Sequence, residues 1–197
     1  MDKRPLTVVF CLPGASFSGR FLQCWTELLA WCLRNGITPV ISQKQSCNIY
    51  YVRNMCLGAD VLRGAKQKPF DGKLRYDYIM WIDSDILFTP EHFGRLLAHD
   101  ADIVSGVYLM EDRKHFAAVQ DWDEQYFAEH GCFRFLTPAN LDGKEGLLEV
   151  AYTGMGFMLV KKGVFESMEY PWFRPLRKQI GNAVDFPMED VGFCLFA

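Results

Sequence analysis

Apolar runs separated by amphipathic stretches make up the first half of the chain. Residues 6–11 and 37–42 are mostly apolar and rich in β-branched side chains, which predicts two short strands. Over 19–34 the apolar side chains keep a helical spacing, and Ser18 stands in the N-cap position, so we expect a helix there. A second helix is expected over about 48–64, after the second strand.

The run 78–82 contains no charged residue, which is typical of a strand buried on both faces. A helix is expected to begin at Pro90. Residues 102–106 and 156–160 predict two more strands, one on either side of the polar, irregular stretch 111–149. Strands that alternate with helices favour an α/β fold, with a mostly parallel central sheet and helices on both faces. Ligands of such sheets bind at the carboxyl ends of the strands.

Composition and charge narrow the class of protein. The 197 residues, 50% hydrophobic and 15% aromatic, are enough for one domain with a sizeable core, so we expect 1–197 to form a single domain. A net charge of -3 argues against a nucleic-acid-binding protein. No apolar run approaches the roughly 20 residues of a membrane span. Seven cysteines without a Cys-x-x-Cys pair indicate free thiols in a reducing compartment such as the cytoplasm.

The sharpest candidate site is the triplet Asp83, Ser84 and Asp85, which directly follows the buried run 78–82. Two carboxylates this close repel each other at the mouth of a sheet unless a cation lies between them. Oxygen ligands suit Mn²⁺ or Mg²⁺, which also bind phosphate oxygens. The alternative is that both aspartates cap a turn and the following helix.

A loop and a helix are expected beside this triplet. Leu12, Pro13, Gly14 and Ser16 follow the first strand, where backbone could lie against a base and ribose; the alternative is an ordinary tight turn. The Gly-Lys-Ser/Thr ending of a phosphate-binding P-loop is absent. Arg53, on the second expected helix, could pair with phosphate, or it could lie on a solvated helix face.

Two further motifs lie in the second half of the chain. Gly154 and Gly156 flank Met155 before an apolar run, so the backbone there could approach a ligand closely; the alternative is a β-bulge. Glu189 and Asp190 open the last expected helix. A carboxylate there could bind a substrate hydroxyl or accept its proton, or the pair could simply favour the positive end of the helix dipole.

The irregular stretch 111–149 contains His115, Trp122 and Tyr126. The four histidines of the chain show no metal-ligand spacing, and a role for His115 in a site stays open. Aromatic faces suit stacking on sugars, but packing in a core or under a loop explains Trp122 and Tyr126 equally well.

Five segments resemble the motifs of the GT-A family of nucleotide-sugar-dependent glycosyltransferases. They are the Arg-Asn helix 48–54, the strand with the aspartate pair 76–86, the strand and loop 102–108, the glycine-containing strand 152–160 and the Glu-Asp helix start 189–194. The resemblance spans nearly the whole chain. It extends to viral members of the family that glycosylate capsid protein, which implies the host cytoplasm as the location.

The resemblance implies a UDP-sugar donor, a glycan acceptor that includes protein-linked glycans, and Mn²⁺ or Mg²⁺ as cofactor. Asp83 and Asp85 would hold the metal. Glu189 or Asp190 would act as base if the reaction inverts; if it retains configuration, as the viral likeness favours, the leaving phosphate would take the proton. The residues implied in binding the nucleotide sugar are Leu12, Pro13, Gly14, Ser16, Arg53, Asn54, Asp83, Ser84, Asp85, Ser105, Gly106, Gly154, Met155 and Gly156.

Three other functions are compatible with an aspartate pair. In haloacid-dehalogenase-type phosphatases the motif lies near the N-terminus and continues with Thr or Val where this chain has Leu87. A nucleotidyltransferase of related fold would release diphosphate. An inactive nucleotide-sugar-binding module would bind donor without turnover, and the intact carboxylate pairs argue against it.

The end of the sequence carries a prediction about chain length. The helix that begins at Glu189 reaches Ala197 without a Gly, Asn or Pro terminator. We therefore expect this chain to be a fragment of a longer polypeptide, in which a further metal ligand could follow Ala197.

Overall fold

The computed structural model describes residues 4–197 and divides them into two units. Unit 1 contains the chain up to Gly106 together with Met155–Phe173. Its elements are β1 (Leu6–Pro13), α1 (Gly19–Arg34), β2 (Ile37–Lys44), α2 (Ile49–Cys56), the short 3-10 helices η1 (Val61–Arg63) and η2 (Pro69–Gly72), β3 (Tyr78–Ile82), α3 (Pro90–Ala98), β4 (Ile103–Ser105), β7 (Phe157–Lys161) and α6 (Val164–Ser167).

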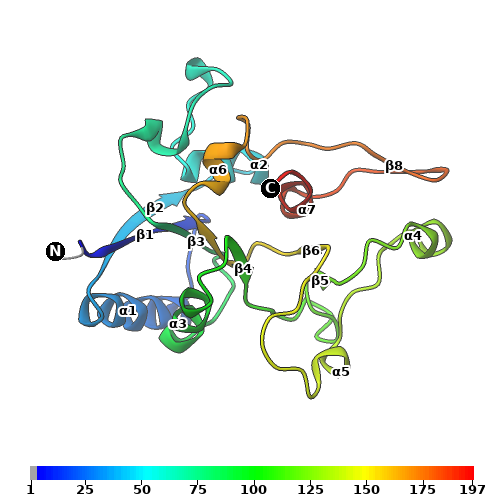
Figure 1. The fold of residues 1–197 in the computed structure, drawn as a ribbon, viewed down its shortest axis with the longest axis horizontal. Coiled ribbons are helices and arrows are strands. Elements are labelled where there is room, and N and C mark those ends of the chain that lie inside the picture. The colour runs from blue at the N-terminus through cyan, green and yellow to red at the C-terminus, as the bar shows by residue number, and fades with distance from the viewer. Residues whose placement is uncertain (1–3) are drawn as a thin grey trace. The chain divides into compact units, whose positions relative to one another are not determined.

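Unit 1 is built on a five-stranded mixed sheet with the order β2-β1-β3-β7-β4 (Figure 1). β1 runs parallel to β2 and β3, whereas β7 runs antiparallel to β3 and β4. The α/β class is confirmed, but the expectation of a mostly parallel sheet needs correction. β7 follows the long segment 107–154 instead of a crossover helix, so it can enter the sheet from the edge at which β3 ends.

Helices cover both faces of this sheet, with α1 and α3 on one side and α2 and α6 on the other (Figure 1). Side chains alternate between the two faces of a sheet along a strand, so consecutive residues of β1 contact helices on opposite faces. The Phe10 ring packs on Trp25 of α1 and Phe93 of α3, with ring centroids 5.3 and 5.5 Å apart. The next residue, Cys11, donates from its Sγ to the Cys56 carbonyl at the end of α2.

Local signals explain where the first two helices begin and end. The Ser18 hydroxyl accepts a hydrogen bond from the Phe21 amide, so α1 starts where the sequence predicts. α2 is shorter than the expected 48–64. It ends at Cys56 because Gly58 takes a left-handed conformation (φ 73°), and a Cβ on that glycine would crowd the Phe70 backbone at 3.2 Å.

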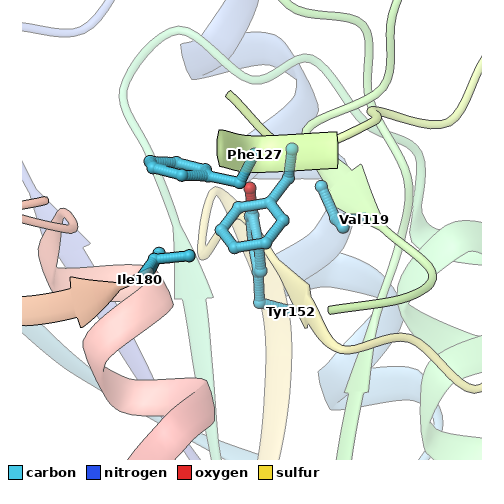
Figure 2. Packing of buried hydrophobic residues seen from close by; sticks show 5 residues of the cluster. Val119, Phe127, Tyr152 and Ile180 are labelled. Carbon is cyan, nitrogen blue, oxygen red and sulfur yellow. The ribbon is translucent and has the colours of Figure 1, made fainter. Parts of the chain in front are cut away.

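Unit 2 contains Val107–Gly154 and Arg174–Ala197. Its elements are β5 (Ala118–Val119), α4 (Glu124–His130), α5 (Pro138–Leu141), β6 (Tyr152–Thr153), β8 (Lys178–Ile180), β9 (Ala183–Asp185) and α7 (Glu189–Phe196), with β5 paired to β6 and β8 to β9. Figure 2 shows part of its apolar core, which comprises Val119, Phe127, Phe133, Tyr152 and Ile180. The stretch expected to be irregular therefore carries short elements that are held together by one cluster of buried side chains.

Two simple properties concern both units. All seven cysteines are free thiols. Within the part of the chain that the structure describes, no helix is long and apolar enough to cross a membrane.

Candidate functional site

An ion pair joins α2 to the carboxyl end of β3. Arg53 Nη1 lies 2.6 Å from Asp83 Oδ1, and Nη2 lies 2.9 Å from Oδ2, so the pairing is bidentate. The Arg53 side chain is only 3% exposed and that of Asp83 29%. The guanidinium also lies 5.3 Å from the centre of the Trp81 ring. This burial rules out the solvated-face alternative for Arg53.

The pairing separates the roles of the two aspartates. Both carboxylate oxygens of Asp83 accept hydrogen bonds from Arg53, whereas Asp85 is exposed. Among residues 4–197 no group of three or more His, Cys, Asp or Glu side chains is placed to hold a metal ion. The expectation that Asp83 and Asp85 hold a metal ion stays a prediction.

The loop after β1 lies against the aspartate triplet. Gly14 has φ 151°, and a Cβ built on it would lie 3.0 Å from the Ser84 Cβ, so only glycine allows this approach. Its amide donates to the Lys44 carbonyl at 2.9 Å, and its carbonyl accepts from Gln43 Nε2 at 2.6 Å. The end of β2 therefore fixes the backbone of this loop beside Ser84.

Two residues expected in that loop belong to the strand instead. β1 continues to Pro13, and both Leu12 and Pro13 are buried. The continuous pairing of β1 with β2 as far as Lys44 explains the longer strand. Ser16 is exposed in the loop proper.

A cavity of about 620 Å³ opens at the carboxyl ends of β1 and β2, within the volume range of small-molecule sites. Apolar and polar side chains line it: Ala15, Phe17, Gln43, Lys44, Gln45 and Met55. None of these six was among the predicted site residues. The polar run that follows the apolar part of the second strand, at 42–45, is the sequence signal that would have indicated them, because it marks a strand's carboxyl end.

The antiparallel strand β7 brings a third segment to the same edge of the sheet. Its amino end lies beside the carboxyl end of β3, and the Gly156 carbonyl accepts from the Asp83 amide at 2.9 Å. The Phe157 carbonyl accepts from the Gly106 amide at 2.9 Å and from Ser105 Oγ at 3.1 Å. Ser105, Gly106 and Gly156 are therefore gathered with the aspartate triplet.

The structure buries both Asn54 and Met155. Asn54 is buried, and its side-chain amide donates to the carbonyls of Tyr50 and Phe173 at 2.8 and 2.7 Å. These bonds make Asn54 a link between α2 and the chain near Phe173, and the expected contact with the nucleotide stays a prediction. Met155 is almost fully buried, so its side chain belongs to the core.

Gly154 belongs to unit 2, where packing accounts for the glycine. A Cβ at this position would overlap the Tyr108 hydroxyl oxygen and lie 3.0 Å from the Ala117 Cβ. The Gly154 amide donates to the Ala117 carbonyl at 2.6 Å. Within unit 2 the Tyr108 side chain explains the need for glycine, and the expected approach to a ligand stays a prediction.

Replacing Gly154 by Ala is expected to lower the free energy of unfolding by about 1–3 kcal/mol, the usual effect of overpacking. The new methyl must displace the Tyr108 ring. Denaturant unfolding of Gly154→Ala measures the effect, and Gly19→Ala, where a Cβ would meet open space and φ is not positive, is the comparison. Adding Tyr108→Phe should restore part of the loss. An unchanged free energy of unfolding in Gly154→Ala would contradict the crowding.

Glu189 and Asp190 form the first turn of α7, also in unit 2. Glu189 is buried, whereas Asp190 is partly exposed and its Oδ1 accepts from the Val191 amide at 2.7 Å. Burial, and after it the negative charge of Asp190, raises the pKa of Tyr152. Asp190 is therefore a charged neighbour of the unit 2 core and the more accessible carboxylate of the pair.

The two aromatic side chains of the irregular stretch are packed against neighbours. The Tyr126 ring stacks on His130 with centroids 4.0 Å apart, and the Arg134 guanidinium lies 4.6 Å from the same ring. Trp122 packs on Phe133 with centroids 4.2 Å apart. These contacts favour packing over sugar stacking.

Comparison with known proteins gives a likeness of fold. No protein-family model matches the sequence, and no curated protein matches it either. Among solved structures, the crystal structure of A197 from STIV is similar with a TM-score of 0.50 and 20% identity, over 96% of this chain and 76% of that one. A glycosyltransferase involved in the glycosylation of the major capsid of PBCV-1 is similar with a TM-score of 0.38 and 10% identity, over 83% and 63%. The first likeness shows a related fold, and the second is too remote to indicate an activity.

Proposed function

We propose that this protein is a divalent-metal-dependent glycosyltransferase of the GT-A type, which transfers a sugar from a UDP-sugar to a glycan, including glycans linked to protein. One observation carries the proposal. Asp83, the Arg53 that pairs with it, the Gly14 loop and the Gly156 carbonyl meet at one edge of the sheet, beside the 620 Å³ cavity. This is the edge at which α/β proteins bind ligands.

The donor would be held by three features of unit 1. The cavity, which Phe17, Met55, Gln43 and Gln45 help to line, would take the base of the nucleotide. Asp85 would hold Mn²⁺ or Mg²⁺, which supplies positive charge to the leaving diphosphate. Arg53 keeps Asp83 in one orientation and adds a buried positive charge behind the triplet.

The acceptor hydroxyl forms the new bond to the anomeric carbon as the bond to the diphosphate breaks. If configuration inverts, Asp190 is the proposed proton acceptor, because it is the more accessible of the two candidate carboxylates. If configuration is retained, the leaving phosphate takes the proton and Asp190 binds the hydroxyl.

Asp190→Asn is expected to reduce transfer about 10²-fold, the typical contribution of general acid–base catalysis, and to leave donor affinity nearly unchanged. Transfer assays and calorimetry on the same variant measure the two quantities. Glu145→Gln, an exposed carboxylate of the same unit, is the matched control. An equal loss of donor affinity would indicate that Asp190 helps to bind the donor instead. Full activity would indicate that Asp190 only stabilises the first turn of α7.

A thermal-shift screen of nucleotide sugars, with and without Mn²⁺, tests the proposed function. A donor at a hundredfold excess over its Kd stabilises the folded state by about 2.7 kcal/mol. We expect stabilisation by UDP-sugars in the presence of metal only. Release of diphosphate would instead indicate a nucleotidyltransferase, and binding without turnover an inactive module; absence of any nucleotide effect would refute the proposal.

A further inference from the structure

A ring of hydrogen bonds closes the carboxyl ends of β1 and β2 in unit 1. The Gly14 amide donates to the Lys44 carbonyl at 2.9 Å. The side chain of Gln43 completes the ring, because its Nε2 donates to the Gly14 carbonyl at 2.6 Å and to the Lys44 carbonyl at 3.3 Å. All three residues belong to unit 1, and Gln43 is one of the residues that line the 620 Å³ cavity. The ring therefore holds the Gln43 side chain in place at this cavity.

These bonds decide which way round the Gln43 amide lies. A backbone carbonyl oxygen can only accept, so the group that faces two such oxygens must be the NH₂ group. Turning the amide over would bring Oε1 against the same two carbonyl oxygens and would lose both bonds. Because both bonds are made by Nε2, the polar atom that Gln43 can still offer to a ligand is the acceptor Oε1.

The backbone at this point does not need the Gln43 side chain to join the two strands. The pairing of β1 with β2 continues to Pro13 and Lys44, and the backbone bond between Gly14 and Lys44 extends it into the loop. What Gln43 adds is one oriented amide on an exposed side chain that a ligand can approach. Because this side chain is already ordered, less conformational entropy is lost when a ligand binds to it.

The rest of the cavity lining contributes apolar surface to the same space. Phe17 and Met55 both line the cavity, and the Phe17 ring packs on Phe21 of α1 with centroids 4.8 Å apart. A pocket with apolar walls and few fixed polar atoms is typical of sites for small heterocyclic ligands. The fixed polar atom here is an acceptor, so it suits a heterocycle that presents an N–H group.

We propose that Gln43 Oε1 accepts a hydrogen bond from the N3–H group of uracil and thereby selects uridine over cytidine nucleotides. This inference rests on the proposed function and adds the residue that recognises the base. The base of uridine has a single N–H group, at N3, whereas cytosine carries a lone pair there, which an acceptor repels. A site built to bind an N–H group discriminates against the analogue that lacks it. Gln43 would contact the base, and the carbonyls of Gly14 and Lys44 would keep its amide oriented.

The test compares UDP with CDP by calorimetry in Mn²⁺. The wild type is expected to bind UDP about tenfold more tightly than CDP, the magnitude of one hydrogen bond. Gln43→Ala removes the acceptor, so this variant should bind the two nucleotides with equal affinity. Gln23→Ala, at an exposed glutamine of α1 in the same unit, is the matched control and should keep the wild-type ratio of the two affinities.

A second variant and a second probe separate recognition of the base from support of the loop. Gln43→Lys keeps a donor for the carbonyls of Gly14 and Lys44 but has no acceptor, so it should also lose the preference for UDP. The probe is 3-methyluridine diphosphate, in which a methyl group replaces the hydrogen at N3. It should bind the wild type about tenfold more weakly than UDP, whereas Gln43→Ala should bind both equally.

The outcomes separate this inference from the proposed function. If the wild type binds UDP but Gln43→Ala or Gln43→Lys keeps the same ratio of UDP to CDP affinity, only the role of Gln43 is overturned. Tighter binding of CDP than of UDP by the wild type would overturn it as well, because Oε1 would then face the amino group of cytosine. If no nucleotide binds the wild type, the proposed function fails and this inference fails with it.

Discussion

Arg53→Ala is expected to lower the free energy of unfolding by about 2–3 kcal/mol. Removing one partner of a buried ion pair usually costs about 3–5 kcal/mol, because the other charge is left uncompensated. Asp83 is 29% exposed, so water would solvate part of its charge and the loss should fall at or just below the lower end of that range. Loss of the guanidinium beside the Trp81 ring adds to the effect. Urea denaturation of the variant measures it.

A double-mutant cycle isolates the pair from other effects of the truncation. The losses of Arg53→Ala, Asp83→Ala and the double variant should be strongly non-additive, because either single substitution already removes the Arg53–Asp83 pairing. Arg53→Lys is the matched control: it keeps the charge but cannot form the two parallel bonds. Additive losses would show that Arg53 stabilises the fold through packing alone.

The same variant tests the nucleotide contact that the sequence predicts for Arg53. The free energy of UDP binding should become less favourable by about 1.5–3 kcal/mol, the contribution of one charge-assisted hydrogen bond. Calorimetry must be done under conditions in which the variant is still folded, and the unfolding curve identifies those conditions. An unchanged Kd would restrict Arg53 to its pairing with Asp83.

Asp85→Ala is expected to abolish metal-dependent donor binding while leaving the free energy of unfolding within about 0.5 kcal/mol of the wild type. Asp85 is exposed, so its removal does not disturb packing. Arg53 binds both oxygens of Asp83, so Asp85 is the carboxylate of the triplet that would hold a divalent ion beside the diphosphate. Calorimetry of the tightest UDP-sugar in Mn²⁺ measures the loss.

The contrast with Asp83 makes this prediction specific. Asp83→Asn should lower both stability and donor affinity, whereas Asp85→Asn should lower donor affinity alone. Asp121→Ala, another exposed aspartate, should lower neither. Undiminished donor affinity of the wild type in excess chelator would contradict a metal-dependent site at Asp85.

The sequence by itself predicted the elements that depend only on residues close together in the chain. The hydroxyl of Ser18 caps α1 as expected, and the uninterrupted apolar run 78–82 forms a strand buried on both faces. Both features are local: a cap needs a side chain three residues from an amide, and a buried strand needs only its own side chains to be apolar. The position of Asp83 and Asp85 at the end of that strand follows directly.

Only the tertiary structure decided which side chains contact one another and in which direction β7 pairs with its neighbours. Nothing near Asn54 in the sequence indicates its bond to Phe173, 119 residues away, and nothing near β7 indicates that it runs antiparallel to β3. Arg53 and Asp83 were each identified from sequence, but as ligands of a donor rather than of each other. Periodicity reports which face of an element is buried. Which group a buried side chain meets depends on how distant segments pack, and this packing made Arg53 a partner of Asp83 and left Asp85 exposed.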